Sequence, residues 1–132
     1  ALVSSGGLYA LVDRSDAGHQ AVVRALEETG GALVALAPVV TEAVRLAERL
    51  LGDGAGERLV EAVGSGQLLF QPVEQRDWEA ARRLRREEEG LSLTGALVLT
   101  AAVRLGVEAV LCREPPLAAA SRRRGLRALP EG

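Results

Sequence analysis

Apolar stretches of two kinds alternate along the chain. Short continuous apolar runs, typical of buried strands, are separated by longer segments whose apolar residues recur every three or four positions, as on one face of a helix. The predicted strands lie at Ala1–Val3, Ala32–Ala37, Gln67–Gln71, Val107–Cys112 and Leu126–Leu129. Strands that alternate with helices favour a parallel sheet with helices on both faces. We therefore predict an α/β fold, a three-layer α/β/α sandwich with a central parallel sheet of about five strands.

The clearest part of this pattern is the segment Leu91–Glu114, a predicted helix that leads into a buried strand. Ser92 or Thr94 can cap the start of the helix, and Gly106 can supply the left-handed residue that ends it. Open α/β sheets carry their binding sites at the carboxyl ends of their strands. We therefore expect the functional site where Glu114 follows the strand.

Composition narrows the class of protein. At 132 residues and 48% hydrophobic side chains, the chain can bury a core, and we expect a single domain over residues 1–132. No apolar run approaches the roughly 20 residues of a membrane span, and no targeting segment is recognisable, so we expect a cytoplasmic protein. The net charge of −2 gives no overall attraction to nucleic acid. All 16 basic residues are arginine, a bias found in some proteins from hot habitats.

Polar residues at four positions are predicted to meet at the carboxyl edge of this sheet. Ser4 and Ser5 follow the first strand, Glu42 lies in the first turn of the helix after the second, and Thr94–Gly95 begins a later helix. Glu114 follows the fourth strand. The two serines can cap the first helix or hold a phosphate at its N-terminus, but they lack the glycine pattern of a dinucleotide-binding loop.

The order and spacing of these positions resemble those of the PIN-domain proteins, in particular the small VapC-type ribonuclease toxins of bacterial toxin–antitoxin pairs. The similar segments are Leu2–His19, Pro38–Gly52, Leu91–Ala102 and Val110–Pro130. The resemblance implies a PIN-like fold, one or two Mg²⁺ or Mn²⁺ ions held by three or four carboxylates, and hydrolysis of single-stranded RNA by a metal-activated water. It also implies an antitoxin-like peptide as a partner and a homodimer.

The chain departs from the acidic pattern of that family. Ser4 stands where the family has its first Asp, and Gly95 stands where it has the Asp at the helix start. Glu42 matches the second acid. Glu114 takes the last position if the segments align without a gap, whereas a shift of one residue places Arg113 there. We therefore predict that Glu42 and Glu114 are the remaining acids and that they hold a metal weakly or not at all.

Two arginine clusters are candidates for phosphate contacts. Within the Arg82–Arg86 run, Arg83 is spaced to pair with Glu87 on a solvated helix face, and Arg85 is spaced likewise to pair with Glu89. The second cluster is Arg122–Arg124, which no acidic residue follows closely. It is therefore the better candidate for a phosphate contact. The predicted RNA- or phosphate-binding residues are therefore Ser5, Arg122, Arg123 and Arg124.

The favoured hypothesis is a VapC-like protein with lost or much weakened nuclease activity that acts by binding RNA, an antitoxin-like peptide or a second copy of itself. Two alternatives stay open. In one, the chain is an active Mg²⁺- or Mn²⁺-dependent endoribonuclease, and Asp13 or Asp16 completes the ligand set of Glu42 and Glu114. In the other, it is a phosphate- or nucleotide-binding α/β domain that uses the Ser4–Gly7 turn.

Overall fold

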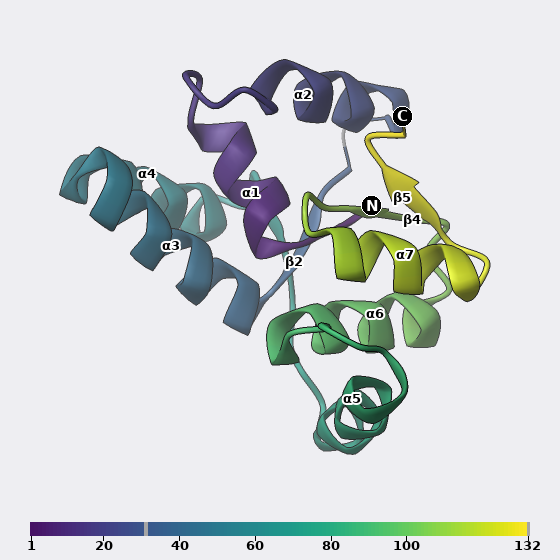
Figure 1. The fold of residues 1–132 in the computed structure, drawn as a ribbon. Coiled ribbons are helices and arrows are strands. Elements are labelled where there is room, and N and C mark those ends of the chain that lie inside the picture. Colours follow the sequence, from purple (N-terminus) through teal and green to yellow (C-terminus); the bar gives the residue numbers. More distant parts are fainter. Residues whose placement is uncertain (31, 132) are drawn as a thin grey trace.

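The computed structural model describes residues 1–30 and 32–131, and helices and strands alternate along them as predicted (Figure 1). The strands are β1 (Leu2–Val3), β2 (Val34–Leu36), β3 (Leu69–Gln71), β4 (Ala109–Leu111) and β5 (Arg127–Leu129). The helices are α1 (Ser5–Val12), α2 (His19–Glu28), α3 (Ala37–Leu51), α4 (Asp53–Gly64), α5 (Gln75–Glu87), α6 (Leu93–Leu105) and α7 (Pro115–Arg123). Each predicted strand is present, although each is shorter than its predicted range.

Within the described residues the strands form one parallel sheet in the order β3-β2-β1-β4-β5. The centre of the sheet is fully apolar because helices cover both faces: Leu2 and Val3 of β1, and Val110 and Leu111 of β4, have no exposed surface. The edge strand β3 differs, since Phe70 is about half exposed. The predicted parallel sheet is confirmed.

Helices cover the two faces of the sheet in separate groups (Figure 1). Helices α1 to α4 lie together on one side, where α1 packs on α2 and α3, and α4 packs back on α3. Helices α6 and α7 lie on the other side, and α5 packs against the outside of α6. The protein therefore has the predicted three layers. None of the described helices is long and apolar enough to cross a membrane.

Local signals explain the boundaries of α6, the helix at the centre of the second layer. Ser92 is its N-cap, because the Ser92 Oγ accepts a hydrogen bond from the Gly95 N–H at 2.9 Å. Thr94 instead turns its hydroxyl away from the helix. Gly106 ends the helix in the left-handed conformation, with φ of 68°. Every residue of Gly95–Ala102 is buried, since α6 lies between the sheet and other helices.

The ion pairs of α5 differ from those predicted. Among the described residues, neither Arg83 with Glu87 nor Arg85 with Glu89 forms a pair. Glu87 accepts a hydrogen bond from Arg124 instead. The reason is tertiary: the end of α5 lies beside the carboxyl end of α7, and the closer cation comes from that element rather than from the next helical turn.

Candidate functional site

An open groove runs across the carboxyl edge of the sheet, where α1, α3 and α6 begin. It brings together four segments that are far apart in the sequence. The residues that line it are Ser5, Gly6, Ala37, Pro38, Thr41, Glu42, Arg45, Leu46, Arg49, Thr94 and Glu114. The predicted edge positions therefore meet in one place, because the strands are parallel and their carboxyl ends share one edge.

The side-chain carboxylate of Glu114 accepts three hydrogen bonds. The Ser4 hydroxyl donates to Glu114 Oε1 at 2.6 Å, and the Arg113 backbone N–H donates to the same oxygen at 2.9 Å. The Gly6 N–H donates to Glu114 Oε2 at 3.1 Å. Both oxygens of this carboxylate therefore already accept hydrogen bonds, two of them from the first turn of α1 and the residue that caps it.

Ser4 has a second partner that explains its place. Its Oγ accepts a hydrogen bond from the Gly7 N–H at 3.0 Å, so Ser4 is the N-cap of α1. The same oxygen donates its proton to Glu114. Ser4 is almost fully buried, at 1% exposure. The Ser4 hydroxyl therefore makes both of its hydrogen bonds, one as donor and one as acceptor, within the protein.

The second remaining acid also has a protein partner. The Thr94 hydroxyl donates to Glu42 Oε2 at 2.8 Å, which joins the start of α6 to the first turns of α3. Glu42 is exposed, and its carboxylate faces the groove. Gly95, the next residue, contributes no side chain, and its N–H is used by Ser92.

The proposed third acids lie elsewhere. Asp13 accepts hydrogen bonds from the Tyr9 hydroxyl and the Ser15 hydroxyl, both at 2.5 Å. These bonds from Ser15 and Tyr9 hold the pKa of Asp13 below its usual range, although burial opposes the shift. Asp16 forms an ion pair with Arg113. Neither aspartate lines the groove, so the structure does not bring either one to Glu42 and Glu114.

The donor set does not fit the divalent ion that the resemblance implies. Mg²⁺ needs several oxygen ligands in a near-octahedral arrangement, usually with carboxylates to anchor it. In the described part of the chain, no group of three or more His, Cys, Asp or Glu side chains could hold a metal ion. The Glu42 and Glu114 carboxylates are joined to hydroxyls instead. Two carboxylates that each accept hydrogen bonds from protein donors are therefore all that this edge of the sheet offers, which is too few to anchor the ion.

Arg113 and Glu114 occupy distinct places. The Arg113 guanidinium pairs with Asp16 in the loop after α1, whereas the Glu114 side chain contacts Ser4 and Gly6. An alignment without a gap therefore agrees with the geometry, since it puts the carboxylate rather than the guanidinium next to Ser4.

The predicted arginine cluster is at the wrong end of α7 for this groove. Glu114 precedes the first residue of α7, while Arg122 and Arg123 lie in its last turn, about 12 Å along the axis. Arg123 pairs with Glu88, and Arg124 pairs with both Glu87 and Glu88. The acids come from α5, so inspection of the neighbouring sequence could not find them.

Two cations of the groove were missed by the sequence analysis. Arg45 and Arg49 are exposed on α3 and line the groove, and no ion pair involves either one within the described residues. Their spacing offers a signal: Glu42, Arg45, Leu46 and Arg49 follow one another at the intervals of a single helix face. Helix α3 begins at Ala37, so Glu42 lies in its second turn rather than in the first turn as predicted, and both arginines follow on the same face.

Ser5 lies where it was predicted, at the N-terminus of α1 in the groove. Its hydroxyl is buried, and no protein group among the described residues hydrogen-bonds to it. A buried hydroxyl without a partner is energetically costly and calls for an explanation. Cys112 offers no nucleophile nearby, because burial, assisted by the charge of Glu114, raises its pKa to about 12.

Comparison with solved structures identifies the fold. A crystal structure of VapC20 from Mycobacterium tuberculosis, a toxin that cleaves the sarcin-ricin loop, matches with a TM-score of 0.81. The match covers 90% of this chain and 93% of that chain at 20% sequence identity. No protein-family model and no curated protein sequence matches the chain. The described residues therefore have the VapC-like PIN fold, as the resemblance predicts. The antitoxin-like peptide and the homodimer stay predictions.

Proposed function

We propose that this VapC-like PIN-fold protein binds single-stranded RNA in the groove at the carboxyl edge of its sheet and has lost, or nearly lost, metal-dependent cleavage. The observation that carries the proposal is the Glu114 carboxylate, whose oxygens accept hydrogen bonds from Ser4, Gly6 and Arg113. Three protein donors solvate this carboxylate at the point where the family resemblance predicts a metal ligand, although they leave its negative charge in place.

Charge supports the loss of metal-dependent chemistry. Ser4 and Gly95 stand in place of two aspartates, so the number of carboxylates at this edge is about two instead of about four. The affinity for a hard divalent ion depends on the negative charge of these carboxylates. Polarisation of a phosphate and activation of water by a bound metal contribute several kcal/mol to catalysis, and each 1.4 kcal/mol is about a factor of ten in rate. A weakly held ion therefore predicts a steep loss of activity.

The remaining groups of the groove suit a phosphate backbone. Arg45 and Arg49 are one helical turn apart on α3, so two cations face the same side of the groove. Ser5, whose hydroxyl has no hydrogen-bond partner among the described residues, also lines the groove. Contacts of this kind hold a nucleic acid backbone without reading its sequence.

The two alternatives make different demands. An active endoribonuclease needs a third ligand, but Asp13 and Asp16 are engaged by Tyr9, Ser15 and Arg113. A phosphate- or nucleotide-binding domain would use Ser5 and the start of α1 alone. Its affinity would not depend on the arginines of α3, which distinguishes it from the proposal.

The first test is binding of a short fluorescein-labelled single-stranded RNA, followed by fluorescence anisotropy over a range of salt concentrations. We expect Arg45→Gln with Arg49→Gln to weaken binding. For a single strand, each phosphate contact makes the slope of log association constant against log salt concentration more negative by about 0.7. Removing two such contacts should therefore make the slope less steep by about 1.4. The matched control is Arg85→Gln with Arg86→Gln, which removes two exposed arginines of α5 and should leave the slope unchanged.

Cleavage is measured on the same RNA in Mn²⁺ and in Mg²⁺, with chelator as a control for contamination. We expect no cleavage by the natural sequence. Cleavage that Glu42→Ala abolishes would show an active enzyme and contradict the loss of activity. Binding that is equally strong in the Arg45 and Arg49 double variant would contradict the proposed RNA path.

A further inference from the structure

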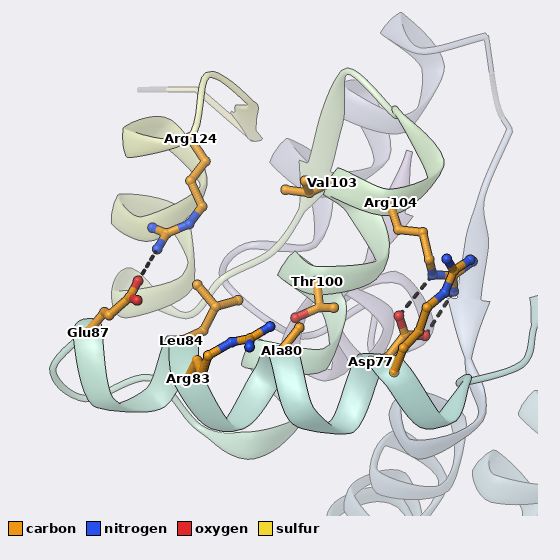
Figure 2. Close-up of a pocket in the computed structure, with 10 residues that line it drawn as sticks. Asp77, Ala80, Arg83, Leu84, Glu87, Thr100, Val103, Arg104 and Arg124 are labelled. Atoms are coloured by element: carbon orange, nitrogen blue, oxygen red, sulfur yellow. Dashed lines mark hydrogen bonds and ion pairs between the residues drawn. The ribbon is translucent and has the colours of Figure 1, made fainter.

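A second groove lies on the far side of the second layer, between α5 and α6 and closed at one end by α7 (Figure 2). It has a volume of about 740 Å³ and shares no residue with the groove at the sheet edge. The residues that line it are Arg76, Asp77, Ala80, Arg83, Leu84, Glu87, Thr100, Val103, Arg104 and Arg124. Neither the VapC-like fold nor the proposed function assigns it a ligand. We call it the α5–α6 groove.

The walls of the α5–α6 groove are apolar and contributed by both helices. Ala80 and Leu84 line it from α5, and Val103 lines it from α6 with 55% of its side chain exposed (Figure 2). A surface-exposed valine opposite a leucine leaves apolar surface in contact with water. Covering this surface with an apolar group removes it from water, which favours binding.

Ion pairs bound the groove at its two ends. At one end Asp77 accepts two hydrogen bonds from Arg104, each of 2.9 Å, and at the other Glu87 accepts one from Arg124 at 3.1 Å (Figure 2). Asp77 and Glu87 are ten residues apart on α5, so the ends are about 15 Å apart along the helix. A groove of about 740 Å³ that is about 15 Å long suits a small molecule rather than an extended peptide.

The polar groups between those ends are few and unpaired. Arg83 is exposed at the groove, and no ion pair involves it within the described residues. Thr100, at 8% exposure, carries a buried hydroxyl that has no hydrogen-bond partner among the described residues. The acids at the ends are each neutralised by an arginine. The free charge inside the groove is therefore positive, and the orphan hydroxyl offers a donor.

We propose that the α5–α6 groove binds a small organic acid, an apolar chain or ring that carries one carboxylate. The apolar part covers Ala80, Leu84 and Val103, and the carboxylate pairs with Arg83. The buried Thr100 hydroxyl lacks an acceptor within the described residues, and a carboxylate oxygen supplies one when the side chains that cover the hydroxyl move aside. This combination of apolar walls with a few placed polar groups is characteristic of small-ligand sites.

The test is a titration of the protein with octanoate, followed by heteronuclear NMR of the backbone amides. We expect one saturable site, with the largest shifts within Asp77–Glu87 and Ala96–Arg104. Octan-1-ol, which has the same chain without the charge, should bind more weakly. Arg83→Gln should weaken octanoate binding by about three- to tenfold, while the matched control Arg85→Gln, an exposed arginine outside the groove, should not change it.

A second variant separates a ligand contact from a purely structural hydroxyl. Thr100→Val keeps the shape of the side chain and removes the unpaired oxygen, so the protein should become more stable to urea. Octanoate should bind it about two- to tenfold more weakly, as expected when one hydrogen bond is lost. Equal octanoate affinity in the natural protein, Arg83→Gln and Thr100→Val would overturn the proposal. So would shifts scattered over other exposed apolar side chains such as Leu50 and Phe70.

Discussion

Ser4 is the residue at which this sheet edge departs most from an acidic site. Its hydroxyl accepts the Gly7 N–H as the cap of α1 and donates its proton to Glu114. An aspartate at position 4 could also cap the helix, but as an ionised acid it could not donate to Glu114. With aspartate at position 4, two carboxylates would repel each other unless a metal neutralised them. With serine at that position, a hydrogen bond to Glu114 takes the place of this repulsion.

Gly7 is required because α1 begins directly against β4. A Cβ at Gly7 would lie 2.6 Å from the backbone oxygen of Leu111, which cannot move without disturbing the sheet. We expect Gly7→Ala to lower the free energy of unfolding by about 1–3 kcal/mol, measured by urea denaturation. The control is Gly54→Ala near the exposed start of α4, where the Cβ would meet only the end of Arg58 at 3.7 Å.

The control should change stability in the opposite direction. Gly54→Ala should raise the free energy of unfolding by about 0.4–1 kcal/mol, because alanine restricts the unfolded chain and favours a helix. If both variants were equally destabilised, close packing of Gly7 on β4 could not be the cause. A destabilisation confined to Gly7→Ala supports the close approach of α1 to the sheet that places Ser4 beside Glu114.

At the scale of elements, Glu88 joins α5 to the end of α7. Its side chain is 8% exposed and accepts hydrogen bonds from Arg123 and Arg124. These bonds from Arg123 and then Arg124 lower the pKa of Glu88 to about 2, against the opposing effect of burial. This link is formed by residues 35 and 36 positions apart. It therefore depends on the packing of α5, α6 and α7 together.

The lowered pKa predicts how stability depends on pH. A carboxyl group whose pKa is lower in the folded protein contributes stability above its unfolded value, here about 4.5, and loses that contribution as the pH falls towards 2. We expect Glu88→Gln to be less stable than the natural protein at pH 7 and the difference to shrink between about pH 4.5 and 2. Urea denaturation across this range measures it.

Glu89→Gln is the matched control for this link. Glu89 is the exposed neighbour of Glu88, and no ion pair involves it within the described residues. Its variant should follow the pH dependence of the natural protein. A constant difference between Glu88→Gln and the natural protein from pH 7 down to pH 2 would mean that the Glu88 charge does not stabilise the α5–α7 contact.

At the scale of the whole molecule, the sheet decides which residues meet. Ser4 and Glu114 are 110 positions apart, and Glu42 and Thr94 are 52 apart, yet each pair is joined by a hydrogen bond. Ser4 and Glu114 follow the adjacent parallel strands β1 and β4. Glu42 lies on α3, which follows β2 on the other side of β1, and Thr94 lies at the start of α6. The fold therefore brings together the positions at which the family resemblance predicts acids, and two of them, Ser4 and Gly95, carry no acid.

Restoring those acids should restore metal binding to the whole domain. In the variant with Ser4→Asp, Gly95→Asp and Glu114→Asp, a Cβ at position 95 would lie 3.1 Å from the Leu91 Cδ1 and the Ser92 Oγ, side-chain atoms that can shift. We expect this variant to be less stable than the natural protein without metal, because its carboxylates repel one another. Mn²⁺ should raise its thermal midpoint but leave that of the natural protein unchanged.

The measurement is a thermal melt with and without Mn²⁺, repeated after addition of chelator. At a hundredfold excess over the dissociation constant, a bound ion adds about 2.7 kcal/mol to stability, which is a clear shift of the midpoint for a domain of this size. An equal shift in the natural protein would show that Glu42 and Glu114 already hold the ion, and the loss of metal chemistry would be refuted.

Local signals in the sequence predict the alternation of strands and helices, the parallel sheet of about five strands and the end of α6 at Gly106, whereas they leave its cap open between Ser92 and Thr94 until the structure shows Ser92. These features depend on apolar periodicity, on the cap at Ser92 and on the stop at Gly106, which act within a few residues of the chain. The same local signals, together with the resemblance, placed Glu42 and Glu114 at one edge of the sheet.

Only the tertiary structure decided which partners those side chains have. The three donors to Glu114, the pairing of Arg123 and Arg124 with Glu88, the position of Arg45 and Arg49 in the groove, and the α5–α6 groove all depend on elements that pack across the chain. The reason is the distance along the chain over which each kind of interaction acts. Periodicity and capping depend on neighbours within one or two helical turns, whereas a hydrogen bond between distant residues exists only once the layers have packed.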